Sequence, residues 1–373
     1  MRKIYVSVIL ILVVISLTGC NRVDRLLILN WGEYINDEVV EKFEREYNVS
    51  VSISLADSNE LFYSKIKSGT TAYDLVIPSD YMIEKMYTKD LLQPIDLSKL
   101  PNYDLVNNPF MPGVKGIQNL MFPGNEKYAV PYFWGTFGLM YNKQKKGLEE
   151  AVLANGWDAF FEPDKRPAGT RVGMYDVPRF AYAAALLYQD LSPNLADEKA
   201  LDLVYNTLTR FRFDEWGTDL LKKNISGNNL DLAFVYTGDF LDMLYVKLSE
   251  NTSLNDMTFD IYIPDNTIAF MDALVIPKKA RHVELAHLFI DFMLRPENAY
   301  ENAKVIGYCT PLLNSYNEIV NYDGEDTETL ARAYANQKYY PLLENFKGIP
   351  IANLERNFLN RINTIVNNAK AKW

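Results

Sequence analysis

Aromatic and acidic side chains follow a short apolar run near the start of the chain. Residues 26–30 (LLILN) lead directly into Trp31, Glu33 and Tyr34. A short apolar run bounded by turn residues is typical of a buried strand. The end of such a strand in a core would carry Val or Leu, whereas Trp and Tyr faces attract cations and a carboxylate pairs with them. The sequence therefore favours a site for an organic cation at this strand end.

A second apolar run ends in the same way. Residues 74–77 (DLVI) are followed by Pro78 and then by Ser79 and Tyr81. Both runs alternate with helix-like segments, which is typical of a parallel sheet with helical crossovers. Because ligands bind beyond the carboxyl ends of the strands in such sheets, we expect the two strand ends to meet at one site.

Hydrophobic periodicity predicts the other elements of an α/β fold. Strands are expected over residues 26–30, 49–55, 74–77, 171–175, 231–235 and 261–263. Helices are expected over residues 36–47, 61–68, 82–91, 180–190, 197–211, 281–294, 326–340 and 352–370. The extended segments 128–142 and 268–276 are expected to cross between two lobes, which makes a hinge with a cleft between them.

Further candidate site residues lie at later strand ends or crossings. They are Asp176, Tyr236, Asp239, Phe270, Asp272 and Tyr308. The set is aromatic and acidic and contains no lysine, as expected for a ligand with positive charge. The net charge of −10 agrees with a cationic ligand and disfavours nucleic acid as a partner.

Motifs for catalysis and for cofactors are absent from the sequence. His282 and His287 are five residues apart, whereas the zinc-binding helix of metalloproteases needs a spacing of four. Neither a nucleophile elbow nor a phosphate-binding loop occurs. We therefore expect no catalytic residue, no cofactor and no metal site. Carboxylate pairs for glycoside hydrolysis need only spatial proximity, so a surface hydrolase stays an open alternative.

The N-terminus predicts export. Arg2 and Lys3 precede an apolar stretch, residues 4–17, which has the length of a signal segment and not of a spanning helix. The next residues, LTGC, resemble the bacterial lipobox, which implies a signal peptide over residues 1–19 and lipidation of Cys20. We expect a periplasmic or extracytoplasmic protein, anchored to a bacterial membrane by lipid alone. Cys309 is expected to be a packed free thiol.

Seven segments in order carry a family resemblance. They are NWGEYI, DSNELFYSKIKSG, YDLVIPSDYMIEKM, AVPYFWGT, FMDALVIP, FMLRPENA and IGYCTPL. With these segments, residues 26–373 resemble the bacterial polyamine-binding proteins of ABC importers, the spermidine/putrescine and putrescine receptors. The resemblance implies a two-lobed hinged periplasmic-binding-protein fold, type II-like, with the ligand cleft between the lobes. It also implies a monomer that works with ABC permease subunits and a cytoplasmic ATPase. We expect one lobe to comprise residues 24–132 plus 272–316 and the other residues 133–271 plus 317–373.

The resemblance also implies roles for individual residues. The aromatic box of the family matches Trp31, Tyr34, Tyr81, Tyr236, Phe270 and Tyr308. Its hydroxyl positions match Ser79 and Thr218, and its acids match Glu33, Asp176, Asp239 and Asp272. Asp272 matches a carboxylate that both types of receptor share, and it is the site residue on which we rely most.

One departure from the family concerns charge. Three residues after Asp176 the family has a Glu, whereas this chain has Arg179. A permanent cation there should repel a ligand ammonium, or pair with Asp176 and neutralise it. This departure favours putrescine over spermidine.

Other ligands on the same fold remain alternatives. Tyr339 and Tyr340 are adjacent, and phenolates suit ferric ion, although the helix-like run NQKYYPLL favours their packing in a core. Thiamine or another organic cation is a further alternative.

Overall fold

The computed structural model describes residues 24–121, 124, 126–250, 252–340 and 348–372. The expected signal segment and Cys20 lie outside the described residues. Within the described part of the chain, no helix has both the length and the apolar character needed to cross a membrane.

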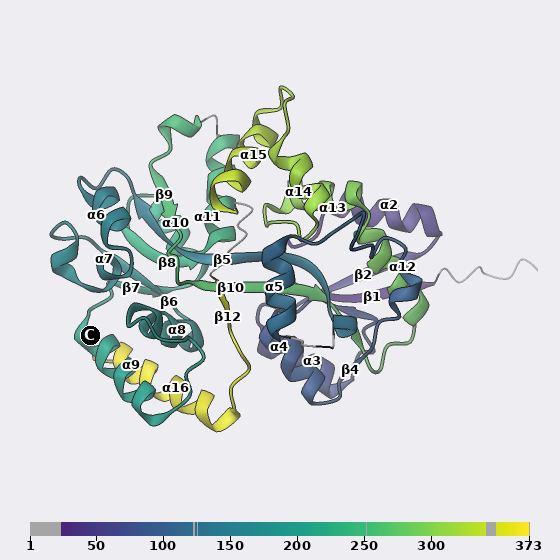
Figure 1. Cartoon of the computed structure of the whole chain (residues 1–373), viewed down its shortest axis with the longest axis horizontal. Helices are drawn as coiled ribbons and strands as arrows, with labels where there is room; N and C mark the ends of the chain where they lie inside the picture. Colours follow the sequence, from purple (N-terminus) through teal and green to yellow (C-terminus); the bar gives the residue numbers. More distant parts are fainter. Residues whose placement is uncertain (1–23, 122–123, 125, 251, 341–347, 373) are drawn as a thin grey trace, which may run out of the picture.

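The first lobe is built on a small parallel sheet with the strand order β2-β1-β3. Its strands are β1 (Arg25–Asn30), β2 (Ser50–Leu55) and β3 (Leu75–Val76), and β4 (Leu92–Gln93) pairs with β11 (Ile276–Pro277) beside them. The helices drawn around these strands in Figure 1 are α2 (Asp37–Tyr47), α3 (Asn59–Ser68), α4 (Asp80–Thr88), α5 (Pro112–Met121), α12 (Val283–Met293), α13 (Pro296–Ile306) and α14 (Leu313–Val320).

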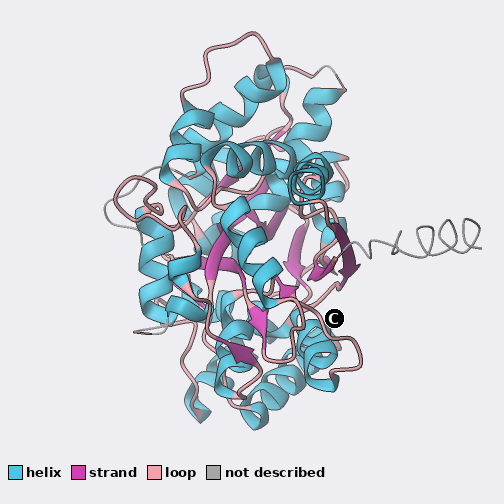
Figure 2. Cartoon of the chain, turned by 90° about the vertical axis from the view of Figure 1, so that its right-hand side faces the viewer, coloured by secondary structure: helices cyan, strands magenta, loops and turns pink. Residues whose placement is uncertain are grey.

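The second lobe contains a mixed sheet with the strand order β12-β10-β5-β8-β6-β7, in which β9 also pairs with β5. Its strands are β5 (Val130–Asn142), β6 (Val172–Tyr175), β7 (Glu215–Gly217), β8 (Leu232–Tyr236), β9 (Phe259–Tyr262), β10 (Ile268–Leu274) and β12 (Ile349–Pro350). Its helices are α6 (Leu148–Asn155), α7 (Trp157–Phe161), α8 (Pro178–Tyr188), α9 (Glu198–Arg210), α10 (Asp219–Ser226), α11 (Thr237–Ser249), α15 (Thr327–Tyr339) and α16 (Arg356–Lys370). Figure 2 shows the strands of both lobes enclosed by helices.

Two antiparallel strands run from one lobe to the other, as the sequence predicted (Figure 1). Every residue of β5 is buried, which fits its mostly apolar sequence and its central place between other strands. The far end of β10 reaches the first lobe, where Val275 pairs with Val76 and Asp272 pairs with Ser79. The crossing strand thereby places Asp272 beside the strand end that carries Ser79.

Local sequence signals set the helix ends near the site. Asn36 accepts a hydrogen bond from the backbone N–H of Glu38 and caps α2, the helix that follows Trp31 and Tyr34. Gly69, with φ at +64°, ends α3 as predicted. The strand expected over residues 49–55 is present as β2, the edge strand of its sheet, and its last residue, Leu55, is 57% exposed.

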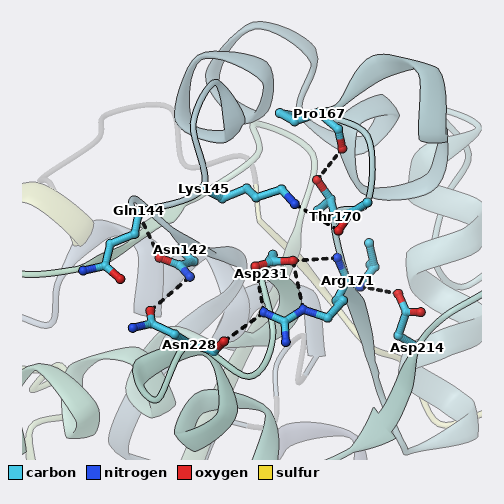
Figure 3. Close-up of polar contacts among 11 residues, drawn as sticks. Asn142, Gln144, Lys145, Pro167, Thr170, Arg171, Asp214, Asn228 and Asp231 are labelled. Carbon is cyan, nitrogen blue, oxygen red and sulfur yellow. Dashed lines mark hydrogen bonds and ion pairs between the residues drawn. The ribbon is translucent and has the colours of Figure 1, made fainter.

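The strands of the second lobe are fixed at the ends remote from the cleft. Arg171 donates hydrogen bonds to both carboxylate oxygens of Asp231 and to the carbonyl oxygen of Asn228 (Figure 3). These contacts tie the start of β6 to the start of β8. Because β6 and β8 are parallel, their opposite ends open together toward the cleft.

Candidate functional site

A cavity of about 470 Å³ lies where strand ends from both lobes meet. From the first lobe it is lined by Trp31, Gly32, Glu33, Tyr34, Ala56, Asp57, Ser58, Asn59, Glu60, Ser79, Tyr81, Ile306 and Tyr308. From the second lobe it is lined by Tyr175, Val177, Phe180, Thr218, Asp219, Lys222, Tyr236, Gly238, Asp239 and Asp242, and from β10 by Phe270 and Asp272. A volume of this size suits a small ligand.

Asp272 is the buried anion at the junction of the lobes. Its side chain lies on β10, and the residue is only 5% exposed. The Tyr34 hydroxyl donates to Oδ2 at 2.5 Å, while Oδ1 has no hydrogen-bond partner among the described residues. Burial raises the pKa of Asp272 to about 6, although the nearby hydroxyls of Ser79 and Tyr34 lower it. Asp272 is therefore an anion at neutral pH, and none of the described side chains forms an ion pair with it.

Hydroxyl groups of the first lobe are aimed by their neighbours. The backbone N–H of Ser79 donates to Asn59 Oδ1 at 3.0 Å, and Asn59 Nδ2 donates back to Ser79 Oγ at 3.1 Å. Burial raises the pKa of Tyr34 well above its usual value, so its hydroxyl stays protonated and donates to Asp272. These contacts fix the polar groups around the carboxylate before any ligand arrives.

Aromatic rings form a continuous wall between the lobes. Tyr34 lies edge-on to Tyr308 with 5.1 Å between ring centroids, Tyr308 and Phe270 are 6.2 Å apart, and Phe270 and Tyr236 are 5.0 Å apart. A Cβ on Gly238 would lie 2.2 Å from Tyr308 Cζ, so only glycine leaves room for this ring. The wall offers flat apolar surface and negative ring faces to a cation with a hydrocarbon chain.

A second carboxylate faces the cavity from the first turn of α11. The Asp239 side chain is 13% exposed, and its Oδ1 lies 3.2 Å from Lys222 Nζ. Asp239 Oδ2 has no hydrogen-bond partner within the described part of the chain. Burial raises the pKa of Asp239, and the Lys222 ammonium opposes this shift. The cavity thus holds two buried carboxylates, each with one oxygen left unpaired.

The structure brings together all but two of the expected site residues. Glu33 and Thr218 line the cavity as exposed residues at its rim. Asp176 and Arg179 do not line it.

The expected pairing of Arg179 with Asp176 is wrong. Arg179 Nη1 donates to Pro193 O at 2.9 Å and Nη2 to Asn194 Oδ1 at 2.7 Å, while Asp176 pairs with Lys370 at 2.5 Å. Arg179 is 9% exposed, and burial lowers its pKa to about 10, which leaves it a cation at neutral pH. Because its guanidinium holds the loop between α8 and α9, Arg179 gives no reason to prefer putrescine over spermidine.

The sequence analysis missed several lining residues. Tyr175 ends β6 and could have been found by the same strand-end signal as Tyr236. Lys222 gave no such signal, since the run DLLKKN looks like a solvated helix face. The expectation of a lysine-free site is therefore wrong.

The ferric-ion alternative gains no support from the tyrosine pair. Tyr339 and Tyr340 are 6% and 1% exposed, which confirms their packing in the core. Across the described residues, no group of three or more His, Cys, Asp or Glu side chains is placed to hold a metal ion. Cys309 is buried and free, as predicted.

The fold and the site define a two-lobed substrate-binding protein with an acidic, aromatic cleft. Its sequence matches the bacterial extracellular solute-binding protein family over residues 29–300, and the chain belongs to that family. It is 29% identical to the putrescine-binding periplasmic protein SpuD of Pseudomonas aeruginosa, over 78% of this chain and 80% of that protein. It is 30% identical to the spermidine/putrescine-binding periplasmic protein of Salmonella typhimurium, over 78% of each chain.

Among solved structures, a similar one is the spermidine/putrescine ABC transporter substrate-binding protein PotD from Streptococcus pneumoniae, with a TM-score of 0.73 and 27% identity. The similarity covers 94% of this chain and 99% of that one. The periplasmic-binding-protein fold expected from the sequence is thereby confirmed.

Arg179 provides a test of the corrected assignment. In Arg179→Met the carbonyl of Pro193 loses its donor, so we expect the free energy of unfolding to fall by about 1–3 kcal/mol. The Arg179 side chain lies outside the cavity. The ratio of the dissociation constants for putrescine and spermidine should therefore change by less than about threefold. Thermal unfolding and titration calorimetry check the two expectations, and a larger change in the ratio would place Arg179 in the site after all.

Asp272 should cost the unliganded protein stability. The pKa of Asp272, about 6 in the folded state, exceeds the ordinary value of an aspartate. The folded protein therefore holds this proton more tightly than the unfolded chain, and the resulting contribution to the free energy of unfolding is lost as the pH rises through 6. At about pH 7.5, Asp272→Asn should raise the free energy of unfolding by about 2–3 kcal/mol. The gain should shrink by about pH 5, where the wild-type carboxyl takes up its proton. Chemical denaturation at both pH values measures this, and a variant less stable than wild type at the higher pH would contradict it.

Proposed function

We propose that this protein is an extracytoplasmic polyamine receptor that captures putrescine and/or spermidine in the cavity and delivers it to an ABC importer. The observation that carries the proposal is the buried Asp272 carboxylate, which lies among aromatic rings and whose Oδ1 has no hydrogen-bond partner in the part of the chain that the structure describes. The names of the two relatives and of the similar solved structure support the same class of ligand.

The chemistry of the cavity matches that of a polyamine. Aliphatic ammonium groups have a pKa near that of lysine, about 10.4, so the ligand stays charged at neutral pH. Burying an ammonium is costly unless an anion and hydrogen-bond acceptors receive it, and Asp272 Oδ1 and Asp239 Oδ2 are two such acceptors. The ring faces of Tyr34, Phe270 and Tyr308 then cover the methylene chain and attract the cations.

Ligand binding would favour closure of the two lobes. The cavity takes residues from both lobes, so a bound ligand bridges them and stabilises the closed state by its higher affinity for that state. The crossing strands β5 and β10 are the proposed hinge, and the proposed lobe boundaries at residues 132/133 and 271/272 fall within them.

The remaining parts of the proposal follow from the family and the sequence. The closed form would dock as a monomer on ABC permease subunits driven by a cytoplasmic ATPase. The receptor would be held at the membrane by lipid on Cys20 after removal of residues 1–19. It would bind and release its ligand without turnover, as a transport protein and not an enzyme.

Titration calorimetry of residues 21–373 tests the proposed ligand. We expect heat from putrescine or spermidine with a dissociation constant at or below about 1 µM, a free energy of about −8 kcal/mol. Asp272→Asn should weaken binding by at least about a hundredfold, because the ammonium then loses its buried anion.

Asp176→Asn is the matched control for that titration. It makes the same chemical change to a carboxylate outside the cavity, so its affinity should stay within about threefold of wild type. Wild-type affinity in Asp272→Asn would refute the site, and the absence of heat from both polyamines would refute the ligand class.

A further inference from the structure

Lys222 is a cation of the protein that lines the cavity. It lies one turn into α10, its side chain is 9% exposed, and it reaches three carboxylates. Its Nζ lies 2.7 Å from Asp219 Oδ1, 2.8 Å from Asp242 Oδ2 and 3.2 Å from Asp239 Oδ1. Burial opposes the charged form, but these carboxylates raise the pKa of Lys222. The side chain is therefore an ammonium held at a fixed place beside the cavity.

This ammonium makes the two buried anions of the cavity, Asp272 and Asp239, unequal. Asp272 receives a hydrogen bond from a neutral tyrosine hydroxyl, and no ion pair to it occurs among the described residues. Asp239 is already paired with Lys222 through Oδ1 and keeps only Oδ2 for a ligand. Asp219 and Asp242, which are about half exposed and also line the cavity, complete the coordination of Lys222.

We propose that Lys222 is a specificity-determining residue that sets the number of ammonium groups the cleft accepts. This inference rests on the proposed function. Lys222 occupies the position beside Asp239 that a further ligand ammonium would need, and it repels any cation placed next to it. A diamine can place one ammonium at Asp272 Oδ1 and the other at Asp239 Oδ2. A triamine brings an additional ammonium, which Lys222 repels when it lies toward α10, and which otherwise must use the exposed carboxylates Glu33, Asp57 and Glu60 of the first lobe.

The test is a comparison of putrescine and spermidine binding to wild type and Lys222→Gln by titration calorimetry. Glutamine keeps most of the length of the side chain and a donor for the carboxylates but removes the charge. We expect spermidine affinity to rise by at least about tenfold relative to putrescine affinity. Lys222→Arg keeps the cation and should keep the wild-type ratio.

Lys223→Gln is the matched control. Lys223 lies next to Lys222 on the same helix and pairs with the other oxygen of Asp219 at 2.5 Å, but it is outside the cavity lining. This variant makes the same change in net charge but at a side chain outside the cavity. The ratio of spermidine affinity to putrescine affinity should therefore stay within about threefold of wild type. An equal shift in both variants would show that general electrostatics, and not the position of Lys222, sets the ratio.

A double variant limits the risk that the loss of Lys222 leaves too many unpaired carboxylates for the protein to fold. Lys222→Gln combined with Asp242→Asn removes one cation and one anion, so it leaves the net charge of the cluster unchanged, and it should also shift the ratio toward spermidine. An unchanged ratio, or a shift toward putrescine, in the folded variants would overturn the inference while the proposed function stands. Absence of binding of either polyamine by the wild-type protein would overturn both.

Discussion

The central constraint of this structure is a buried carboxylate, Asp272, that forms no ion pair with any residue the structure describes. Asp272 lies at the junction of the lobes, and no described residue of the chain supplies a cation that neutralises it. Tyr34 from the first lobe and the strand end at Ser79 hold the carboxylate in place, while the crossing strand β10 carries it. At neutral pH a bound cation offsets the stability lost by burying this anion, and in the proposed function this couples ligand capture to closure of the lobes.

The two ends of the cleft use different means to hold charge. At Asp272 the surroundings are neutral hydroxyls and rings, so a ligand ammonium meets an anion in a poorly solvated place. At Asp239 the protein supplies a lysine ammonium, which reduces the burial cost of the carboxylate and leaves a weaker acceptor for the ligand. This asymmetry gives the cleft an orientation and a preferred ligand charge, which uniform acidity would not provide.

Much of this site could be predicted because it lies at strand ends. Parallel strands leave aromatic and acidic residues at one edge, and the signals at Trp31 and Ser79 identified that edge from local sequence alone. The helix α10 was missed because it spans only eight residues, and α11 because its apolar periodicity is weak; Lys222 was missed with α10. Arg179 shows the opposite error: its position next to an expected ligand residue suggested a role that its actual hydrogen bonds exclude. Side-chain direction depends on tertiary packing, which residue spacing does not encode.

A crystal structure of the protein grown with putrescine tests the central claim most directly. The account predicts one ligand ammonium within hydrogen-bond distance of Asp272 Oδ1, the other directed to Asp239 Oδ2, and the methylene chain against Tyr34, Phe270 and Tyr308. A bound diamine with neither ammonium at Asp272, or a ligand outside this cavity, would contradict it.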